Sequence, residues 1–255
     1  MKQRDGKGKK MIEKLDDLVD LHTHTIASGH ARDTIEDMVE KAKNRGIRLY
    51  GITDHAVTMP GTCDEAYFHN LKNLKRDYYE EMELCLGVEL NIISYEGEVD
   101  MPECDLKEMD VAIASIHNTI GYMAGTIEQN TNAIIKAMKN PYVNIIGHPD
   151  DGRVPLDYER IVKASKEYGT LLELNNNSIS SGFRLNAREN AGIMLEYCKK
   201  YSVPIIIGSD AHATSVVGRH EAAIELINEV GLDYELVLNF YPEQVKKYLN
   251  KYRKK

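Results

Sequence analysis

Short apolar runs alternate with longer segments of helical spacing along most of the chain. The seven runs cover residues 18–21, 49–53, 84–93, 111–116, 143–147, 170–174 and 204–208. Several of them, such as VAIASI and VPIIIG, are apolar almost throughout. Continuous apolar runs of this length are typical of strands that are buried on both faces of a parallel sheet. The pattern therefore predicts seven parallel strands.

The segments between the runs predict helices. Residues 34–44 gather their apolar positions on one stripe, with Asp33 or Thr34 to cap the start and Gly46 after the end. The other predicted helices cover residues 65–81, 126–139, 157–168, 185–201 and 221–230. Repeated strand–helix units imply either a barrel or a doubly wound sheet. The first strand has no glycine-rich phosphate loop after it, which argues against a dinucleotide-binding fold.

Composition narrows the class of protein. The chain has 255 residues, of which 42% are hydrophobic and 28% charged, as expected of a globular protein with a sizeable core. Its apolar runs are shorter than the roughly 20 residues that a membrane span needs. The pattern predicts one domain over residues 16–250, preceded by a basic tail over residues 1–15. The tail leads into no apolar stretch of signal-peptide length.

Charge and cysteine usage bear on partners and location. The net charge of -8 argues against a nucleic-acid partner, which usually meets a basic face. The four cysteines are widely spread without a CxxC pair, so we expect no disulfide framework and a cytoplasmic location. The sequence leaves the oligomeric state open, a homo-oligomer included.

Histidine and carboxylate residues stand at the ends of the predicted strands. His22 and His24 are alternate residues of one strand, so their rings can point the same way and share an ion. The other strand-end residues are Glu89, His55, His117, His148, Asp210 and His212. In a parallel barrel these ends meet at one face. Imidazole and carboxylate are ligands for zinc, iron or manganese, and this set is large enough for two or three ions.

A single histidine at a strand end is more often a hydrogen-bonded loop residue than a metal ligand. Six of the seven predicted strands, however, end in a histidine, an aspartate or a glutamate, and this explanation does not account for so many. His30 lies in the loop after the first strand, and its position alone leaves both interpretations open. His69 and His220 lie inside or beside helical patterns, and we expect no chemistry from them.

Ordered motifs carry a family resemblance. They are His22-Thr23-His24, Ser28-Gly29-His30, Thr53-Asp54-His55, Ser115-Ile116-His117, Gly147-His148-Pro149 and Ser209-Asp210-Ala211-His212, with Glu89 between the third and fourth. This ordered set resembles the PHP (polymerase and histidinol phosphatase) domain family, close to its YcdX-like phosphatase branch. The resemblance runs from about Val19 to Tyr248. Arg32 and Asp33 depart from the small or aromatic neighbours expected beside His30.

The resemblance implies a distorted seven-stranded (β/α) barrel with parallel strands and an active site at the strand C-termini. It also implies three divalent metal ions, zinc first, with manganese or iron as alternatives. One ion would take His22, His24, Glu89 and Asp210. A second would take Glu89 as a bridge, with His117 and His148. The third would take His30, His55 and His212.

The chemistry expected of such a site is hydrolysis of a small phosphate monoester by a metal-activated hydroxide. Glu89 and Asp210 would be the catalytic residues, one as the bridge between ions and the other as a ligand that also orients the attacking water. Arg153 and Arg184 follow the fifth and sixth strands and are candidates to bind the substrate phosphate. A salt bridge remains the alternative for each arginine. The amides of residues 175–177 could bond the ligand histidines or substrate, or cap a turn.

Three other functions stay open. A PHP-type nuclease or phosphodiesterase would bring DNA into the same site and should have a basic groove. A metal-binding protein without turnover would usually close each site with four ligands. An amidohydrolase usually carries a carboxylated lysine on a middle strand, and no lysine stands at a predicted strand end here.

Overall fold

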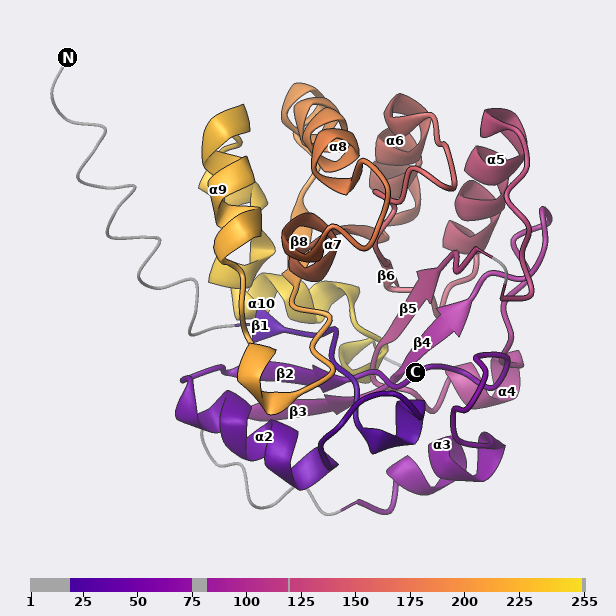
Figure 1. Ribbon diagram of the computed structural model, residues 1–255, viewed down its shortest axis with the longest axis vertical. Helices are drawn as coiled ribbons and strands as arrows, with labels where there is room; N and C mark the ends of the chain where they lie inside the picture. Colours follow the sequence, from indigo (N-terminus) through magenta and orange to yellow (C-terminus); the bar gives the residue numbers. More distant parts are fainter. Residues whose placement is uncertain (1–18, 75–81, 119, 254–255) are drawn as a thin grey trace, which may run out of the picture.

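The computed structural model in Figure 1 describes residues 19–74, 82–118 and 120–253. The predicted tail over residues 1–15 lies outside these ranges, as do residues 75–81 of the second predicted helix. The strands are β1 (Val19–Asp20), β2 (Leu49–Ile52), β3 (Glu83–Leu86), β4 (Val88–Asn91), β5 (Ala112–Ser115), β6 (Ile145–Ile146), β7 (Leu171–Asn175) and β8 (Ile205–Gly208).

The α-helices are α2 (Ile35–Asn44), α3 (Glu65–Leu71), α4 (Glu103–Leu106), α5 (Ile127–Met138), α6 (Tyr158–Tyr168), α7 (Asn176–Ser181), α8 (Ala187–Tyr201), α9 (Glu221–Val230) and α10 (Pro242–Val245). Short 3₁₀ turns are η1 (Ile26–Ser28), η2 (Thr214–Val216), η3 (Tyr234–Leu236), η4 (Leu238–Phe240), η5 (Lys246–Tyr248) and η6 (Asn250–Tyr252).

The strands are all parallel, which confirms the predicted α/β class. They form two sheets, of order β1-β2-β3 and β4-β5-β6-β7-β8, and the described residues show no closed seven-stranded barrel. The predicted third strand divides at Gly87, so that β3 pairs with β2 and β4 with β5. A Cβ atom at Gly87 would lie 2.0 Å from the carbonyl oxygen of Val111. Only glycine therefore fits this close approach of the two chains.

One side chain and one short backbone pairing join the outer edges of the two sheets, β1 and β8, where a ladder would be expected. The Asn239 amide donates to the carbonyls of Val19 in β1 and Ile207 in β8, and its oxygen accepts from the Ile207 N–H. Farther along, His24 N–H donates to the Ala211 carbonyl at 2.8 Å. The seam between β1 and β8 is thus bridged at separate points.

One apolar cluster lies between the two sheets. Every strand except β4 contributes a residue to this cluster, either from the strand itself or from a residue next to it. Three residues of the C-terminal segment complete it, namely Leu238, Val245 and Leu249. Because these side chains form one connected cluster, the two sheets enclose a shared interior even though their hydrogen-bonded ladders do not close.

Two helices begin with a threonine capping box, and the first of these caps was one of the two predicted for residues 34–44. Thr34 caps α2 in a capping box with Asp37, and Thr126 does the same for α5 with Gln129. Helix α3 ends at Leu71, so the described part of the predicted second helix is shorter than expected. The sequence analysis missed α7, which begins directly at the predicted turn of residues 175–177.

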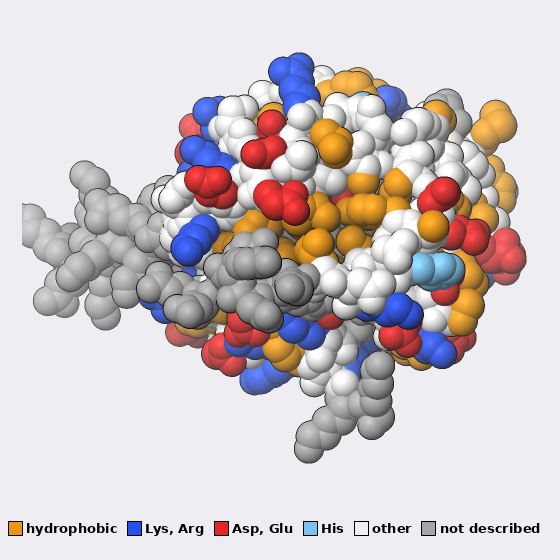
Figure 2. Space-filling view, turned by 90° about the horizontal axis from the view of Figure 1, so that it is seen from below, with side chains coloured by type: hydrophobic (Ala, Val, Ile, Leu, Met, Phe, Trp, Pro, Cys, Tyr) orange, Lys and Arg blue, Asp and Glu red, His pale blue; other side chains and the backbone are white. Residues whose placement is uncertain are grey.

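Helices pack against the strands and against one another. Helices α5, α6, α8 and α9 pack against one another in that order, and α2 lies against β2 (Figure 1). None of the described helices combines the length and the apolar character that a membrane crossing requires. On the face shown in Figure 2, basic and acidic side chains are interspersed, and the described residues drawn there form no continuous basic band.

Candidate metal centre

The structure brings the strand-end residues to one place. Glu89, in β4, is fully buried at the centre of the group. Its two carboxylate oxygens lie 2.7–3.5 Å from ring nitrogens of five histidines, namely His22, His24, His55, His117 and His148. These five rings come from segments after β1, β2, β5 and β6. A single carboxylate shared by so many imidazoles is an arrangement suited to bridging cations.

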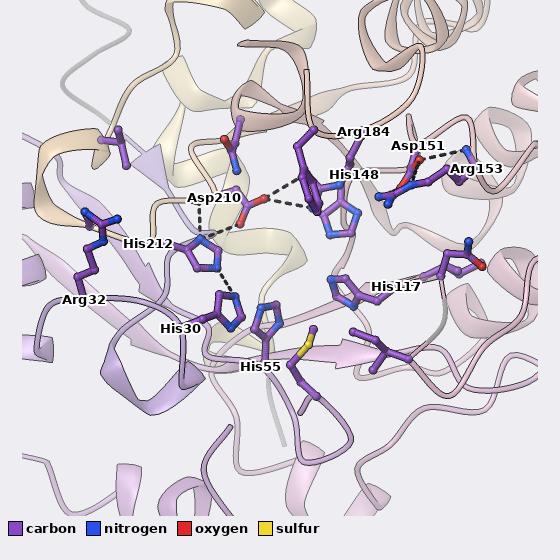
Figure 3. Close-up of a pocket in the computed structure, with 18 of the residues that line it drawn as sticks. His30, Arg32, His55, His117, His148, Asp151, Arg153, Arg184, Asp210 and His212 are labelled. Atoms are coloured by element: carbon purple, nitrogen blue, oxygen red, sulfur yellow. Dashed lines mark hydrogen bonds and ion pairs between the residues drawn. The ribbon is translucent and has the colours of Figure 1, made fainter. Parts of the chain in front are cut away.

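Asp210, just after β8, forms the second acidic point of the group. Its Oδ1 lies 3.4 Å from His24 Nε2 and 3.8 Å from His22 Nε2. Nearer the surface, His212 Nε2 lies 3.0 Å from His30 Nε2 (Figure 3). The loop that carries His30 thus lies against the Asp210–His212 segment. All nine candidate ligands named from the sequence therefore lie in one connected cluster.

Several buried polar atoms in the cluster have no hydrogen-bond partner among the described residues. They are His22 Nε2, His24 Nε2, His55 Nδ1, His148 Nδ1 and Glu89 Oε2. His55 Nδ1 and Glu89 Oε2 lie only 2.7 Å apart, yet their orientation is not that of a hydrogen bond. Buried polar groups without partners are costly unless a cation or water satisfies them. These atoms are the donors that a divalent metal would need.

Three triads have ligand atoms that all lie within 4.8 Å of one another. They are His22–His24–Glu89, His55–Glu89–His117 and His24–His55–His212. The first triad falls within the set assigned to the first ion by resemblance. His55 joins the other two triads, so this ring lies between the second and third sets and not in the third alone. His148 belongs to none of the triads, although its Nε2 lies 2.9 Å from Glu89 Oε1.

The electrostatics of the cluster favour ionised carboxylates. Burial alone would raise the pKa of Glu89, but the rings of His22, His117 and His55 hold it well below its usual value. Burial opposes ionisation of Asp210 as well, and His22, His24 and Arg184 hold the pKa of that carboxyl well below normal. Ionised carboxylates are the form that binds metal.

The histidines divide into two kinds. Burial, followed by the charge of His212, lowers the pKa of His24 well below its usual value, and burial, followed by Arg184, lowers the pKa of His148 to about 4. Both rings are therefore neutral near pH 7. Burial alone would lower the pKa of His22, but Glu173 and the two other carboxylates of the cluster raise it well above normal. A position where carboxylates hold a proton this firmly is also one where they would stabilise a metal cation.

Two residues of the cluster have backbone conformations that are rare outside glycine. His148 has φ 28° and Asp210 has φ 53°. Such conformations cost free energy and are held by the surrounding structure, most often at functional sites. The N–H of His148 donates to Glu173 Oε2 at 2.7 Å, and this bond fixes the turn.

Glu173 is the principal residue that sequence reasoning missed. It is buried in β7, where its Oε1 lies 2.7 Å from His22 Nδ1. A Cβ atom at Gly208 would lie 2.0 Å from that oxygen, so a larger residue here would push Glu173 away from His22. The signal in the sequence was one charged residue inside the apolar run LLELN. By bonding the other ring nitrogen, Glu173 directs His22 Nε2 toward the cluster.

Further polar residues orient the rings from behind. Asn91 Oδ1 lies 2.7 Å from His117 Nδ1, and Ser28 Oγ lies 3.0 Å from His24 Nδ1. Ser28 in turn donates to Asp54, in the Thr53-Asp54-His55 motif. Asp54 had no role in the sequence analysis, although its motif was recognised.

A cavity of about 620 Å³ opens above the cluster and is lined by both candidate substrate arginines. Arg184 is nearly buried and lies 3.2 Å from Asp210 Oδ2. Arg153 is exposed, pairs with Asp151 at 2.5 Å and lies over the ring of Phe183 (Figure 3). Each arginine thus both forms an ion pair and faces the cavity.

Asn175, the last residue of β7, caps a turn as one of the two alternatives predicted, and its amide bonds carboxylates of the site, not the ligand histidines. Asn175 Nδ2 donates to Glu173 at 3.0 Å and to Asp210 at 3.3 Å, whereas its oxygen caps α7 by accepting from Ser178 N–H. Asn177 lines the cavity.

Comparisons with known proteins agree with this geometry. A family model described as the PHP domain matches residues 20–254. A probable phosphatase of Thermoanaerobacter sp. (strain X514) is 43% identical over 238 residues, which cover 93% of this chain and 96% of that protein. A probable phosphatase of Acetivibrio thermocellus is 41% identical over 234 residues, which cover 92% of this chain and 95% of that protein.

Two solved structures share the fold. A histidinol phosphate phosphatase of Lactococcus lactis, solved with zinc, L-histidinol and phosphate, has a TM-score of 0.59 and covers 86% of this chain and 95% of that one. A putative histidinol phosphatase of Listeria monocytogenes has a TM-score of 0.54 and covers 80% of this chain and 98% of that one. Both are 18% identical to this chain, so the likeness concerns the fold alone.

Proposed function

The chain belongs to the PHP domain family, and from this premise we propose that it is a metal-dependent phosphatase that hydrolyses a small phosphate monoester. The observation that carries the proposal is the cluster around Glu89, where buried ring nitrogens without partners surround an ionised carboxylate. The relatives named probable phosphatase, which match almost the whole chain, support the same reaction class.

We assign three divalent ions to the cluster, with zinc as the first choice and manganese or iron as alternatives. His22, His24, Glu89 and Asp210 would hold one ion, Glu89, His117 and His148 a second, and His30, His55 and His212 a third. Bound divalent ions lower the pKa of a coordinated water and neutralise phosphoryl oxygens. A cytoplasmic location belongs to the same proposal, and Cys63, Cys104 and Cys198, none of them in a disulfide within the described residues, are consistent with it.

The chain's own residues would do the following work. Glu89 would hold two ions, since its two oxygens face different histidines. Asp210 accepts a hydrogen bond from the attacking water and so orients it toward phosphorus. Arg184, held against Asp210, and Arg153, at the cavity wall, present guanidinium groups that match phosphate oxygens in fork geometry.

The test is hydrolysis of p-nitrophenyl phosphate by the wild type and by Asp210→Asn, before and after chelation and with zinc or manganese added back. We expect activity that is lost on chelation, returns with metal and is absent from the variant. Asp233→Asn makes the same chemical change at an exposed turn and should behave as the wild type. The double variant His22→Ala with His24→Ala should also be inactive.

Metal content by mass spectrometry of the purified protein should approach three ions per chain. If three ions are bound and no metal supports hydrolysis of the phosphate ester, the phosphatase proposal is wrong. Single-stranded DNA and then amide substrates would be tested next, in place of monoesters.

A further inference from the structure

Arg32 is a cation of the cavity wall that no carboxylate neutralises. It lines the same cavity as Arg153 and Arg184. Those two arginines pair with Asp151 and Asp210. The Arg32 guanidinium has no hydrogen bond or ion pair with any residue that the structure describes. Of the three cavity arginines, Arg32 alone has none of its guanidinium donors engaged by a described residue, whereas Asp151 takes the Nε and Nη2 donors of Arg153 and Asp210 takes donors of Arg184.

The backbone holds Arg32 beside the proposed metal ligands. Its N–H donates to the carbonyl of His212 at 3.0 Å. The carboxylate of the next residue, Asp33, accepts the N–H of Thr214 at 2.6 Å. One bond from the Arg32 main chain and one to the Asp33 side chain thus fix the segment that carries Arg32. Arg32 and Ser215 are both exposed, and both line the cavity.

The cavity has room for more than a phosphate group. Its volume of about 620 Å³ lies within the range of sites that enclose a whole small molecule. Figure 3 shows Arg32 on the side of His30 and His212, with Arg153 on the opposite side beyond His117 and His148. A substrate whose phosphoryl group lies among these histidines would have its leaving group within this space.

We propose that Arg32 binds a second anionic group of the substrate, a phosphate or a carboxylate, on the same molecule as the monoester that is hydrolysed. This inference rests on the proposed phosphatase function and specifies its substrate class. A guanidinium forms paired, charge-assisted hydrogen bonds with either anion, and such bonds are about twice as strong as neutral ones. Arg153 and Arg184 share their donors with Asp151 and Asp210, whereas Arg32 can offer its whole fork to an anion.

The test compares substrates that differ by one anionic group in the zinc-loaded enzyme. Fructose 1,6-bisphosphate against fructose 6-phosphate tests a second phosphate, and 3-phosphoglycerate against glycerol 3-phosphate tests a carboxylate. For at least one pair, the wild type should show about a tenfold or larger preference in kcat/KM for the more anionic member. Arg32→Gln should remove most of that preference through KM, and Arg32→Lys should retain part of it because it keeps the charge but not the fork.

Arg48→Gln is the matched control, since Arg48 is exposed just before β2, at the opposite end of that strand from His55. It should keep the wild-type preference. Hydrolysis of p-nitrophenyl phosphate without any preference for the more anionic members would overturn the Arg32 inference and leave the phosphatase proposal intact. A preference that survives in Arg32→Gln would overturn it equally.

If no phosphate ester is hydrolysed, the phosphatase proposal fails. The role of Arg32 is then tested by measuring how tightly the same compounds bind. The same pairs are then titrated calorimetrically into the zinc-loaded protein. Tighter binding of the more anionic member that is lost in Arg32→Gln supports the inference. Equal binding of both members, or no effect of the substitution, overturns it.

Discussion

Replacing Glu173 by glutamine should weaken metal binding although the residue would not itself be a ligand. On one side, Glu173 Oε2 accepts from His148 N–H at 2.7 Å and from Asn175 Nδ2 at 3.0 Å. On the other, Oε1 lies 2.7 Å from His22 Nδ1. A glutamine amide has one oxygen, and the two donors on the Oε2 side would retain it there. Its NH₂ group would then face His22.

His22 would have to change tautomer in response. With an NH₂ donor opposite it, Nδ1 becomes the acceptor and the ring proton moves to Nε2, the atom that faces Glu89 and Asp210. A protonated Nε2 cannot bind a metal ion. Keeping the ligating tautomer instead would cost one charge-assisted hydrogen bond, about 1.5–3 kcal/mol. Metal affinity should therefore fall about 10- to 100-fold.

The assay is competition for zinc against a chromophoric chelator, with circular dichroism to establish that the variant is folded. Glu196→Gln is the matched control, because Glu196 is an exposed residue of α8 and should leave the affinity unchanged. The kcat/KM for p-nitrophenyl phosphate at limiting zinc should fall in parallel. A folded Glu173→Gln protein with wild-type zinc affinity and stoichiometry would refute the tautomer argument.

Four further results are expected. Gly87→Ala places a Cβ atom 2.0 Å from the Val111 carbonyl and should destabilise the fold by about 1–3 kcal/mol, and an unchanged urea midpoint would contradict this. Asp54→Ala removes the acceptor of four hydrogen bonds and should cost about 2–4 kcal/mol in the same unfolding assay. Burial raises the pKa of Cys63 to about 11, so only about one thiol in a thousand is ionised at pH 8, and a thiol reagent should label the exposed Cys104 far faster. Chelation should lower the melting temperature, because an ion present at 100 times its Kd stabilises the native state by about 2.7 kcal/mol; equal scans with EDTA and with zinc would argue against metal in the native fold.

Local chemistry made much of the fold predictable. The cap at Thr34 and the apolar stripe behind it determine where α2 begins, and both are visible within residues 34–42. Helix α7 was missed because residues 175–177 look like a turn. The helix depends on Asn175 as its cap and on Asn176, whose side chain accepts the N–H of Ala223 in the distant helix α9. Neither contact can be derived from the local pattern.

The division of the third strand was missed for a similar reason. The run of residues 84–93 is apolar on both sides of Gly87, and nothing in its spacing marks a break. The break follows from how closely Val111 approaches, which is a property of the packed sheet. A closed seven-stranded barrel, which the family resemblance implied, would need a continuous third strand and a ladder between β1 and β8, where Asn239 provides bonds instead.

The sequence by itself determined which residues stand at the strand ends, and hence which side chains form the cluster. The two-residue alternation predicted for the first strand has His22 and His24 on the same side, and both rings do face Glu89, although β1 itself ends at Asp20. Only the tertiary structure decided how those side chains are paired. Glu173 reaches His22 across 151 residues, and His55 lies against Glu89 rather than with His30 alone. The physical reason is that periodicity sets the face of a strand on which a side chain lies, whereas register and packing between distant strands set what it meets there.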